Sequence, residues 1–174
     1  MIKLPLRGIN GAGKFAIFDD FDYDLLMQFK WSLSKKGYVQ ASVPAKLMGK
    51  YNVKGIQMQR LLLWDESTTG LFVDHINGDK LDNRRENLRL VTMSQSNMNR
   101  RNINFKRRQS VLSKYKGVWW DRNKWRAAIT FAGKKIYLGR FNDEREAALA
   151  YNKAASFYHG EYACINAIQT GVAS

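Results

Sequence analysis

The chain has 174 residues, enough for one or two small domains that can each bury only a modest core. It carries 29 Lys and Arg against 15 Asp and Glu, a net charge of +14, so the expected partner is a polyanion. Its single cysteine excludes a disulfide framework and a cysteine-rich zinc site, and no apolar run approaches the ~20 residues of a membrane span. We therefore expect a protein of the reducing cytoplasm with no membrane partner.

Residues 1–70 have the pattern of a small β-rich lead-in with one helix. The sequence predicts a strand over 14–18 and a hairpin with strands over 31–33 and 38–42. One helix is expected to follow the acidic run at 19–24. That run is better explained as a solvated helix start, which the helix macrodipole favours, than as a second metal site.

Residues 71–100 predict a β-hairpin followed by a helix. Strands are expected over 71–73 and 88–91, because both runs are short, apolar and partly β-branched, with the strong turn dipeptide Asn77-Gly78 between them. Residues 92–95 have the T-x-x-Q form of a capping box, so the helix should begin at Met93. A helix packed on the hairpin would bring the strand end against the first helical turns, which is what a side-chain metal cage needs.

Asp74 and His75 stand at the end of the first of these strands. A carboxylate oxygen with an oxygen or amide from the helix suits a hard cation such as Mg²⁺ or Mn²⁺, which keeps several waters that a phosphate can displace. His75 can take a proton from an attacking water, because imidazole titrates near neutrality. An Asp-His pair alone is more often a surface turn, but its spacing from the turn, from Asn87 and from the capped helix favours a one-metal nuclease site.

The segment 74–79, the strand that follows Asn87 and the asparagine-rich helix resemble the HNH, or ββα-metal, endonucleases, in the branch found in phage and intron homing enzymes. The resemblance implies that His75 is the general base, that Asp74 binds the metal, and that Asn87 hydrogen-bonds across the hairpin to hold the histidine loop. The lead-in is also similar to the N-terminal part of phage HNH proteins, so residues 1–102 are predicted to form one nuclease domain.

Two positions depart from the family pattern. The family usually has a metal-binding asparagine four residues after the threonine, where this chain has Ser96, followed by Asn97. At about 100° per residue these two side chains leave the helix in different directions. Either Ser96 ligates weakly or through water, or Asn97 serves, or the site is impaired. Gln59 stands where relatives commonly have a histidine, so a catalytically degenerate DNA-binding regulator with the HNH fold is the alternative.

Basic side chains occur through this region and continue beyond it. Residues 103–114 are polar and basic with little apolar periodicity, and they are predicted to form a linker that orders along DNA, with a merely solubilising tether as the alternative. The candidates for phosphate contacts near the cut are Arg84, Arg85, Arg89, Arg100 and Arg101, and those in the linker are Lys106, Arg107 and Arg108.

The C-terminal pattern predicts a three-stranded antiparallel sheet packed on one helix. Apolar and polar residues alternate over 118–120, 125–129 and 136–138, and alanines recur at helical spacing after a D-x-x-E start at Asp143. The other face of the sheet then carries cations, aromatic rings and hydrogen-bonding groups, a mixture that suits a DNA major groove. His159 is expected to cap the helix C-terminus.

Segments 115–118, 124–127, 137–141 and 147–151 of this unit resemble the AP2 DNA-binding domain of plant transcription factors and phage nucleases. In that family the exposed sheet face contacts the major groove. Carried over by position, the resemblance implies DNA contacts from Lys116, Trp119, Asp121, Arg126, Thr130, Lys135 and Tyr137. Plant members have arginines at the positions of Trp119 and Asp121, so their base preferences do not transfer.

The sequence thus predicts an α+β chain with an HNH nuclease domain over 1–102, a basic linker over 103–114 and an AP2-like domain over 115–168. The expected function is a site-directed DNA endonuclease that uses one divalent metal ion, Mg²⁺ or Mn²⁺. Double-stranded DNA is the expected partner, with no obligatory protein partner, and the expected location is the cytoplasm of a phage-infected bacterial cell. A third interpretation, an RNA-binding protein of ribosomal type, rests on the charge alone.

Overall fold

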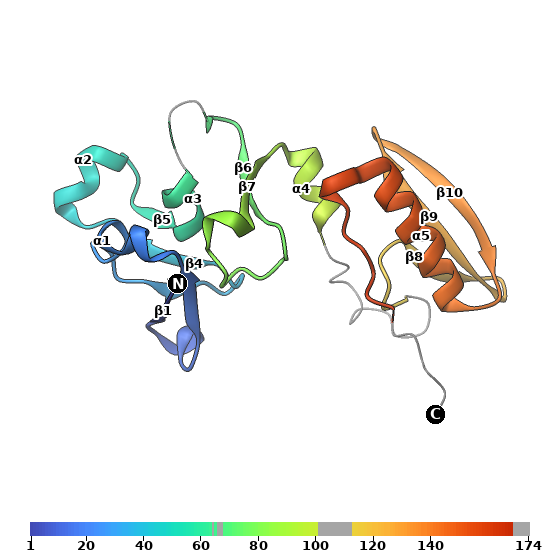
Figure 1. Ribbon diagram of the computed structural model, residues 1–174, viewed down its shortest axis with the longest axis horizontal. Helices are drawn as coiled ribbons and strands as arrows, with labels where there is room; N and C mark the ends of the chain where they lie inside the picture. Colours follow the sequence, from blue (N-terminus) through green and yellow to red (C-terminus); the bar gives the residue numbers. More distant parts are fainter. Residues whose placement is uncertain (64, 66–67, 101–112, 169–174) are drawn as a thin grey trace. The chain divides into compact units, whose positions relative to one another are not determined.

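The computed structural model describes residues 1–63, 65, 68–100 and 113–168, and the chain divides into two compact units, Met1–Met93 and Ser94–Ser174. Each unit mixes helices with small antiparallel sheets, so the predicted α+β class is confirmed (Figure 1). The predicted linker lies almost wholly outside the described residues. The domain boundaries drawn from the sequence therefore stay predictions.

The lead-in of the N-terminal unit forms two antiparallel sheets. The first pairs β1 (Ile2–Pro5) with β2 (Phe15–Phe18), and the second has the order β3 (Ser32–Leu33), β4 (Val39–Ser42) and β5 (Gly55–Gln57). Short helical segments connect them: η1 (Ile9–Gly11), η2 (Asp20–Asp22), α1 (Tyr23–Leu26), η3 (Ala45–Leu47), α2 (Met48–Tyr51) and α3 (Met58–Leu63). The predicted helix is only four residues long, and the Trp31 indole donates to the Leu26 carbonyl where it ends.

The predicted hairpin and helix follow. β6 (Phe72–His75) pairs with β7 (Leu88–Val91), and η5 (Arg85–Asn87) leads into β7. α4 (Met93–Asn99) begins at the residue that the capping pattern indicates, and all but its first residue belong to the second unit. The hydrophobic core of the N-terminal unit joins the lead-in to the hairpin, because Leu88 of β7 packs in the same cluster as Phe18 and Met58.

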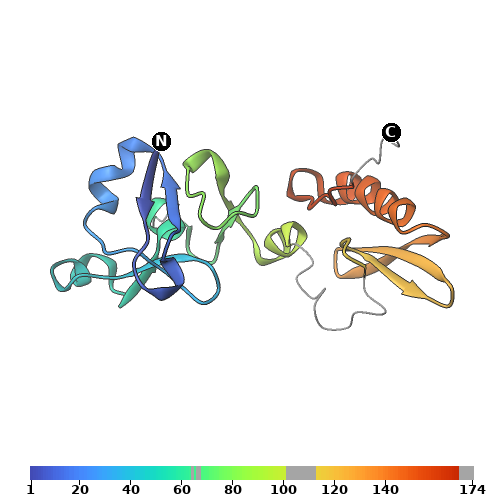
Figure 2. The ribbon, with the colours of Figure 1, turned by 90° about the horizontal axis from the view of Figure 1, so that it is seen from below.

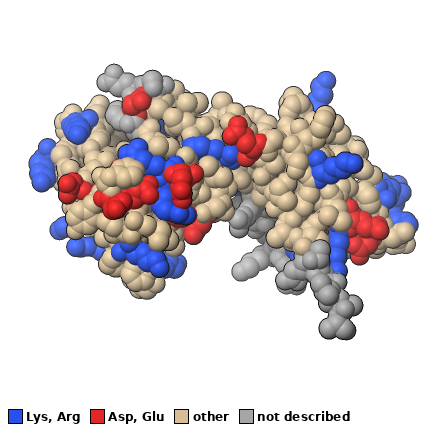
Figure 3. Space-filling view, in the orientation of Figure 1, with Lys and Arg blue, Asp and Glu red and all other residues tan. Residues whose placement is uncertain are grey.

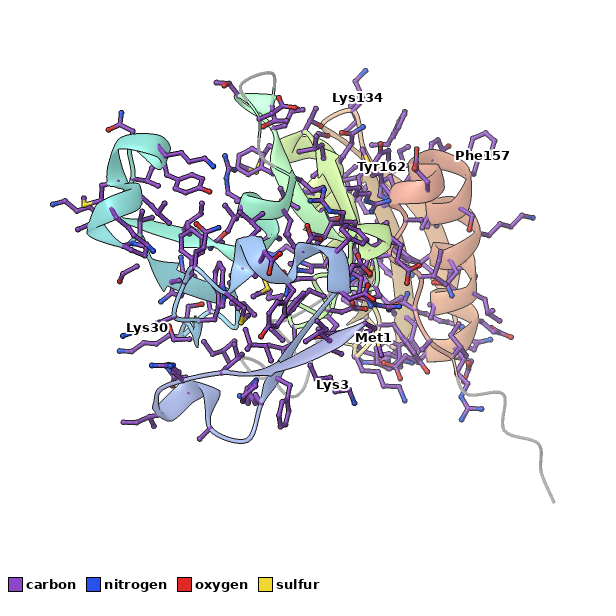
Figure 4. All side chains as sticks on the ribbon, turned by 60° about the vertical axis from the view of Figure 1, so that its left-hand side comes forward. Met1, Lys3, Lys30, Lys134, Phe157 and Tyr162 are labelled. Atoms are coloured by element: carbon purple, nitrogen blue, oxygen red, sulfur yellow. The ribbon has the colours of Figure 1, made fainter. Side chains whose placement is uncertain are left out.

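The C-terminal unit is a three-stranded antiparallel sheet with one helix across one of its faces (Figures 1 and 2). Its elements are β8 (Val118–Asp121), β9 (Lys124–Phe131), β10 (Lys134–Phe141), α5 (Glu144–His159) and η7 (Gly160–Tyr162). The Asp143 side chain caps α5 by accepting from the backbone N–H groups of Arg145 and Glu146 at 2.7 and 3.1 Å. Phe157 projects from the helix away from the sheet (Figure 4).

Gly117 shows how closely α5 lies on this sheet. Ala147, Ala148 and Ala155 are fully buried on the helix face that meets the strands. Gly117, just before β8, has φ +75°, and a Cβ placed there would be 2.0 Å from the Tyr151 ring and 2.7 Å from the Ala128 carbonyl. The Tyr151 ring of α5 thus occupies the space that any side chain at position 117 would need.

Gly117→Ala should destabilise the C-terminal unit strongly, because it combines an unfavourable φ with a clash against a packed ring and a backbone carbonyl. Gly133→Ala is the matched control, since its φ of +74° imposes similar backbone strain while no atom lies within 4 Å of the added carbon. We expect the loss at Gly117 to exceed the loss at Gly133 by about 1–3 kcal/mol in urea unfolding. Equal losses would show that packing against Tyr151 contributes nothing.

Candidate active site

The β6–β7 hairpin holds Asp74 and His75 in consecutive positions. Asp74 lies opposite Arg89 and His75 opposite Leu88, and the Gly78 N–H closes the following turn onto the His75 carbonyl at 2.9 Å. Successive side chains of a strand point to opposite faces. The carboxylate therefore lies on the Arg89 side of the hairpin, and the imidazole on the inner side, where its ring centre is 6.4 Å from that of Tyr38.

His75 is oriented by a buried amide. Its Nε2 lies 3.3 Å from Oδ1 of Asn83, a residue with no exposed surface. The Asn83 Nδ2 donates to the carbonyls of Lys80 and Leu81, so its oxygen must be the atom that faces the ring. A carboxamide oxygen only accepts, which places the proton on Nε2 and leaves Nδ1 as the proton acceptor of the neutral ring.

Burial lowers the pKa of His75, and the hydrogen bond with Asn83 and the charge of Asp74 offset part of this effect. The neutral form is therefore favoured at physiological pH, as a general base requires. The side chain is also well shielded, because His75 exposes only 4% of its surface.

Asn87 bridges the loop between the two strands. Its Oδ1 accepts from the Asn77 N–H at 3.0 Å, and its Nδ2 donates to the Asp82 carbonyl at 2.7 Å. Its own carbonyl accepts from Ile76, which extends the hairpin beyond β6. This is the cross-hairpin contact that the family resemblance implies for Asn87.

The same loop is bound to the lead-in. The Asn83 N–H donates to the Ile17 carbonyl at 2.7 Å, and the Ile17 N–H donates to the Leu81 carbonyl at 2.8 Å, which makes a parallel β-bridge to β2. Asp82 is buried and accepts from the Asn77 amide at 3.0 Å and from the Arg84 guanidinium at 2.7 Å. The hydrogen bonds from Arg84 hold the pKa of Asp82 below its usual range.

Three arginines predicted to clamp phosphates make ion pairs within the chain. Arg84 pairs with Asp82 and Glu86, Arg85 pairs with Asp22 at 2.8 Å, and Arg89 pairs with Asp74 at 3.1 Å. Acidic and basic side chains accordingly lie side by side on the visible face of the N-terminal unit (Figure 3). These pairs give the three arginines structural roles, and phosphate contact stays a prediction.

The interpretation of the acidic run at 19–24 as a solvated helix start is wrong for two of its members. Asp22 is buried and accepts from the Arg85 guanidinium, and Asp19 accepts from the Arg85 backbone N–H at 2.8 Å. Neither caps a helix with its side chain. The run instead attaches the lead-in to η5, a long-range pairing for which a single sequence carries no signal.

The predicted metal ligands come from both units. Asp74 of β6 contributes a carboxylate, whereas Ser96 and Asn97 lie on α4 in the second unit, so which of them ligates stays a prediction. Among the described residues, no three His, Cys, Asp or Glu side chains form a metal-binding group. A single carboxylate with hydroxyl or amide oxygens still fits Mg²⁺ or Mn²⁺, because these hard ions complete their coordination with water.

Gln59, where relatives commonly have a histidine, is 2% exposed in α3. Its Nε2 donates to Gln57 Oε1 at 3.0 Å, and its own Oε1 has no hydrogen-bond partner among the described residues. A buried amide oxygen without a partner is costly. The position therefore fits glutamine less well than the other buried polar sites of this unit.

In the C-terminal unit an aromatic pair covers the centre of the sheet face that α5 leaves open. The ring centres of Trp119 of β8 and Tyr137 of β10 are 6.5 Å apart. Ala128, which pairs with Tyr137 from the central strand β9, is buried. The Lys135 ammonium lies 4.3 Å from the Trp119 ring centre and 5.3 Å from that of Tyr137. Thr130 of β9 is also exposed.

Arg126 and Asp121 form an ion pair on this face at 2.9 Å. Lys116 does not belong to the face, because it is partly buried before β8 and its ammonium donates to the Met98 carbonyl of α4. Burial lowers the pKa of Lys116. Its selection as a DNA contact therefore lacks support from its position, although the role stays untested.

Two further predictions concern the ends of this unit. His159 does not bind the last carbonyls of its own helix; its Nε2 donates to the Thr130 carbonyl of β9 at 2.9 Å, which ties the end of α5 to the sheet. Arg100 is exposed after α4. Arg101, Lys106, Arg107 and Arg108 lie outside the described residues.

Residues 67–98, which include the hairpin, match a family model described as HNH endonuclease. The chain carries an HNH endonuclease motif. An uncharacterized HNH endonuclease of Acanthamoeba polyphaga mimivirus is 29% identical over 163 residues, 91% of this chain and 78% of the viral protein. The homology supports a nuclease function.

AP2-like ethylene-responsive transcription factors of Arabidopsis thaliana also match. Two of them are 38% and 40% identical over 53 residues, which is 30% of this chain but only 18% and 12% of the plant proteins. These matches support a DNA-binding C-terminal unit. No solved structure matches the chain. Within the described residues, no helix is long and apolar enough to cross a membrane.

Sequence reasoning missed Asn83 and Asp82 as contributors to the site. Both lie in the loop between Asn77 and Asn87, where a polar stretch is equally consistent with an exposed turn. The available signal was the uninterrupted run Leu81-Asp82-Asn83-Arg84, in which short polar side chains follow an apolar anchor. Their burial depends on β2, which pairs with the loop from 60 or more residues earlier in the chain.

Asp82→Asn should reduce the loss of unfolding free energy that the protein shows as the pH is lowered. Because Arg84 holds the pKa of Asp82 low, the carboxylate stabilises the fold above its unfolded pKa of about 3.9, and this contribution is lost as the pH falls through the lower folded value. We expect the variant to be roughly 1–3 kcal/mol less stable than the parent near neutral pH and to lose less stability on acidification in urea unfolding.

Asp20→Asn is the control, because this exposed carboxylate makes only a 3.9 Å contact with the N-terminal ammonium. It should change neither the neutral stability nor the acid limb appreciably. If Asp82→Asn and the parent lose the same stability between neutral and acid pH, the proposed contribution of the Asp82 network is refuted.

Proposed function

We propose that this chain is a site-directed DNA endonuclease of the homing or nicking type, which hydrolyses phosphodiester bonds with a single divalent ion, Mg²⁺ or Mn²⁺. The observation that carries the proposal is the 3.3 Å contact of His75 Nε2 with the buried Asn83 oxygen, within the segment that matches HNH endonucleases. This contact favours a proton on Nε2, and Nδ1 would then be the atom that takes the proton of the attacking water.

The residues of the hairpin have separate catalytic and positioning roles. His75 takes the proton of the attacking water, Asn83 holds the ring and its tautomer, and Asn87 keeps the loop closed over both. In an in-line displacement the attacking and leaving oxygens are on opposite sides of phosphorus. Asp74 and His75 are consecutive and point to opposite faces of β6, so the phosphate would have to lie at the end of the strand, with His75 facing the attacking oxygen and Asp74 the leaving oxygen.

Asp74 would hold the metal with Ser96 or Asn97. The bound ion supplies charge stabilisation to the phosphate and the leaving oxygen. Arg89 shares the Asp74 carboxylate and so restrains its position on the strand. It also competes for the negative charge that attracts the ion, which makes metal affinity depend on this arginine.

The C-terminal unit would direct the cut. Its open sheet face enters the major groove of double-stranded DNA, and the basic linker, including Lys106, Arg107 and Arg108, follows the backbone together with Arg100 and Arg101. One active site cuts one strand at a time. If six to ten phosphates are contacted, affinity falls by roughly 10³ to 10⁵ fold between about 50 and 200 mM salt.

Supercoiled plasmid tests the activity. We expect nicks with Mg²⁺ or Mn²⁺, none in EDTA, and loss of nicking in His75→Ala and Asp74→Ala with duplex affinity unchanged in a gel shift. His159→Ala is the matched control, because the second histidine serves the C-terminal fold and should leave the chemical step intact. Nicking that survives His75→Ala would refute the assignment of the base.

Asn83→Ala tests the positioning role separately. Without its amide the imidazole loses its fixed tautomer and orientation, and we expect kcat to fall by about 10² fold with little change in KM. Asn83→Asp retains an acceptor and should restore part of the rate while shifting the acidic limb of the pH profile to higher pH, because a carboxylate raises the pKa of the neighbouring imidazole. A fall in melting temperature with unchanged kcat would instead assign Asn83 a purely structural role.

A catalytically degenerate DNA-binding regulator is the second candidate. Three observations favour it: Ser96 stands in place of the family asparagine, Gln59 is buried without a partner for its oxygen, and His75 exposes only 4% of its surface. Intact plasmid together with a retained gel shift would support this reading. Stronger competition by RNA than by duplex DNA would contradict both candidates.

A further inference from the structure

Arg126 presents an unsatisfied hydrogen-bonding edge on the open face of the C-terminal sheet. It lies on the central strand β9, opposite Trp119 on one neighbour and Arg140 on the other. The Asp121 carboxylate is 2.9 Å from its Nε. Among the described residues, no acceptor binds either of its terminal amino groups.

Asp121 restrains the guanidinium as an ion pair, although the Arg126 Nε makes no hydrogen bond among the described residues. Asp121 occupies the Nε side and comes from the adjacent strand β8, next to a tight turn, so both partners are attached to ordered backbone. The side chains are only 30% and 33% exposed, which limits the conformations that the arginine can adopt. The two terminal amino groups remain as a planar pair of donors for an acceptor outside the chain.

Charge decides which acceptor suits this pair. A phosphate would bring a full negative charge close to the Asp121 carboxylate, and like charges at this separation repel. The major-groove edge of guanine is neutral and offers O6 and N7 at the spacing of an arginine fork. The cytosine paired with it presents an N4 amino group on the same edge, which a carboxylate accepts.

We propose that Arg126 and Asp121 together read one G·C base pair, with Arg126 donating to O6 and N7 of guanine and Asp121 accepting from N4 of the paired cytosine. The inference rests on the proposed function, in which this sheet face enters the major groove. It adds that specificity at one position comes from an arginine and carboxylate pair. The neighbouring Trp119 and Tyr137 would then flank the contact with apolar surface.

The test selects bound sequences from a randomised duplex library, using the full chain in EDTA so that no cleavage occurs. The parent should enrich one position for guanine, with other bases there bound about 5- to 150-fold more weakly. Arg126→Lys keeps the charge but loses the fork, and should abolish this preference while preserving preferences elsewhere. Arg145→Lys, the same change on exposed α5, should alter nothing.

Asp121→Asn completes the test. It should weaken the guanine preference and raise affinity for unselected duplex, because a negative charge leaves the interface. Uniform loss of affinity across sequences in Arg126→Ala, with a shallower salt dependence, would assign a phosphate contact and overturn the inference. Unchanged selection with a lowered melting temperature would overturn it in favour of a structural ion pair. If the parent retains no duplex at all, the proposed function fails and the inference with it.

Discussion

The N-terminal unit depends on one buried amide, that of Asn83. Its side chain sets the proton on His75, and its backbone N–H joins the loop to β2 at 2.7 Å. Asn83 has no exposed surface and makes both contacts. The orientation of the His75 ring therefore depends on the packing of the loop against β2. Asn87 and Asp82 extend the same network to the turn and to Arg84.

The distribution of charge follows from this arrangement. The arginines that surround the loop are engaged with Asp82, Asp22 and Asp74, so their charges are balanced within a few ångströms. The net charge of +14 therefore has to act on a polyanion mainly through other lysines and arginines. The three arginines make ion pairs within the N-terminal unit, and their contact with phosphate stays a prediction.

The sequence was informative where structure is local. The hairpin at β6 and β7, the start of α4 at Met93, the three strands of the C-terminal sheet and the cap at Asp143 follow from turn chemistry, side-chain alternation and capping, which act over a few residues. It was silent on Asn83, on the Asp22 ion pair with Arg85 and on the contact of Lys116, because each depends on a distant partner. The roles of Asp74, Ser96 and Asn97 stay predictions for the same reason.

The bridge between Ile17 and the Leu81–Asn83 loop decides whether the motif can keep its structure when it is transferred to another protein. Residues 67–98 form a contiguous cassette in sequence, yet the strand that seats their loop is encoded some fifty residues upstream. A transplanted cassette would lose the hydrogen bonds that the Leu81 carbonyl accepts from Ile17 and that the Asn83 N–H donates to Ile17, and with them the seating of the loop that carries Asn83. Recombination that exchanges this motif between proteins should therefore carry the lead-in and the motif together as one block.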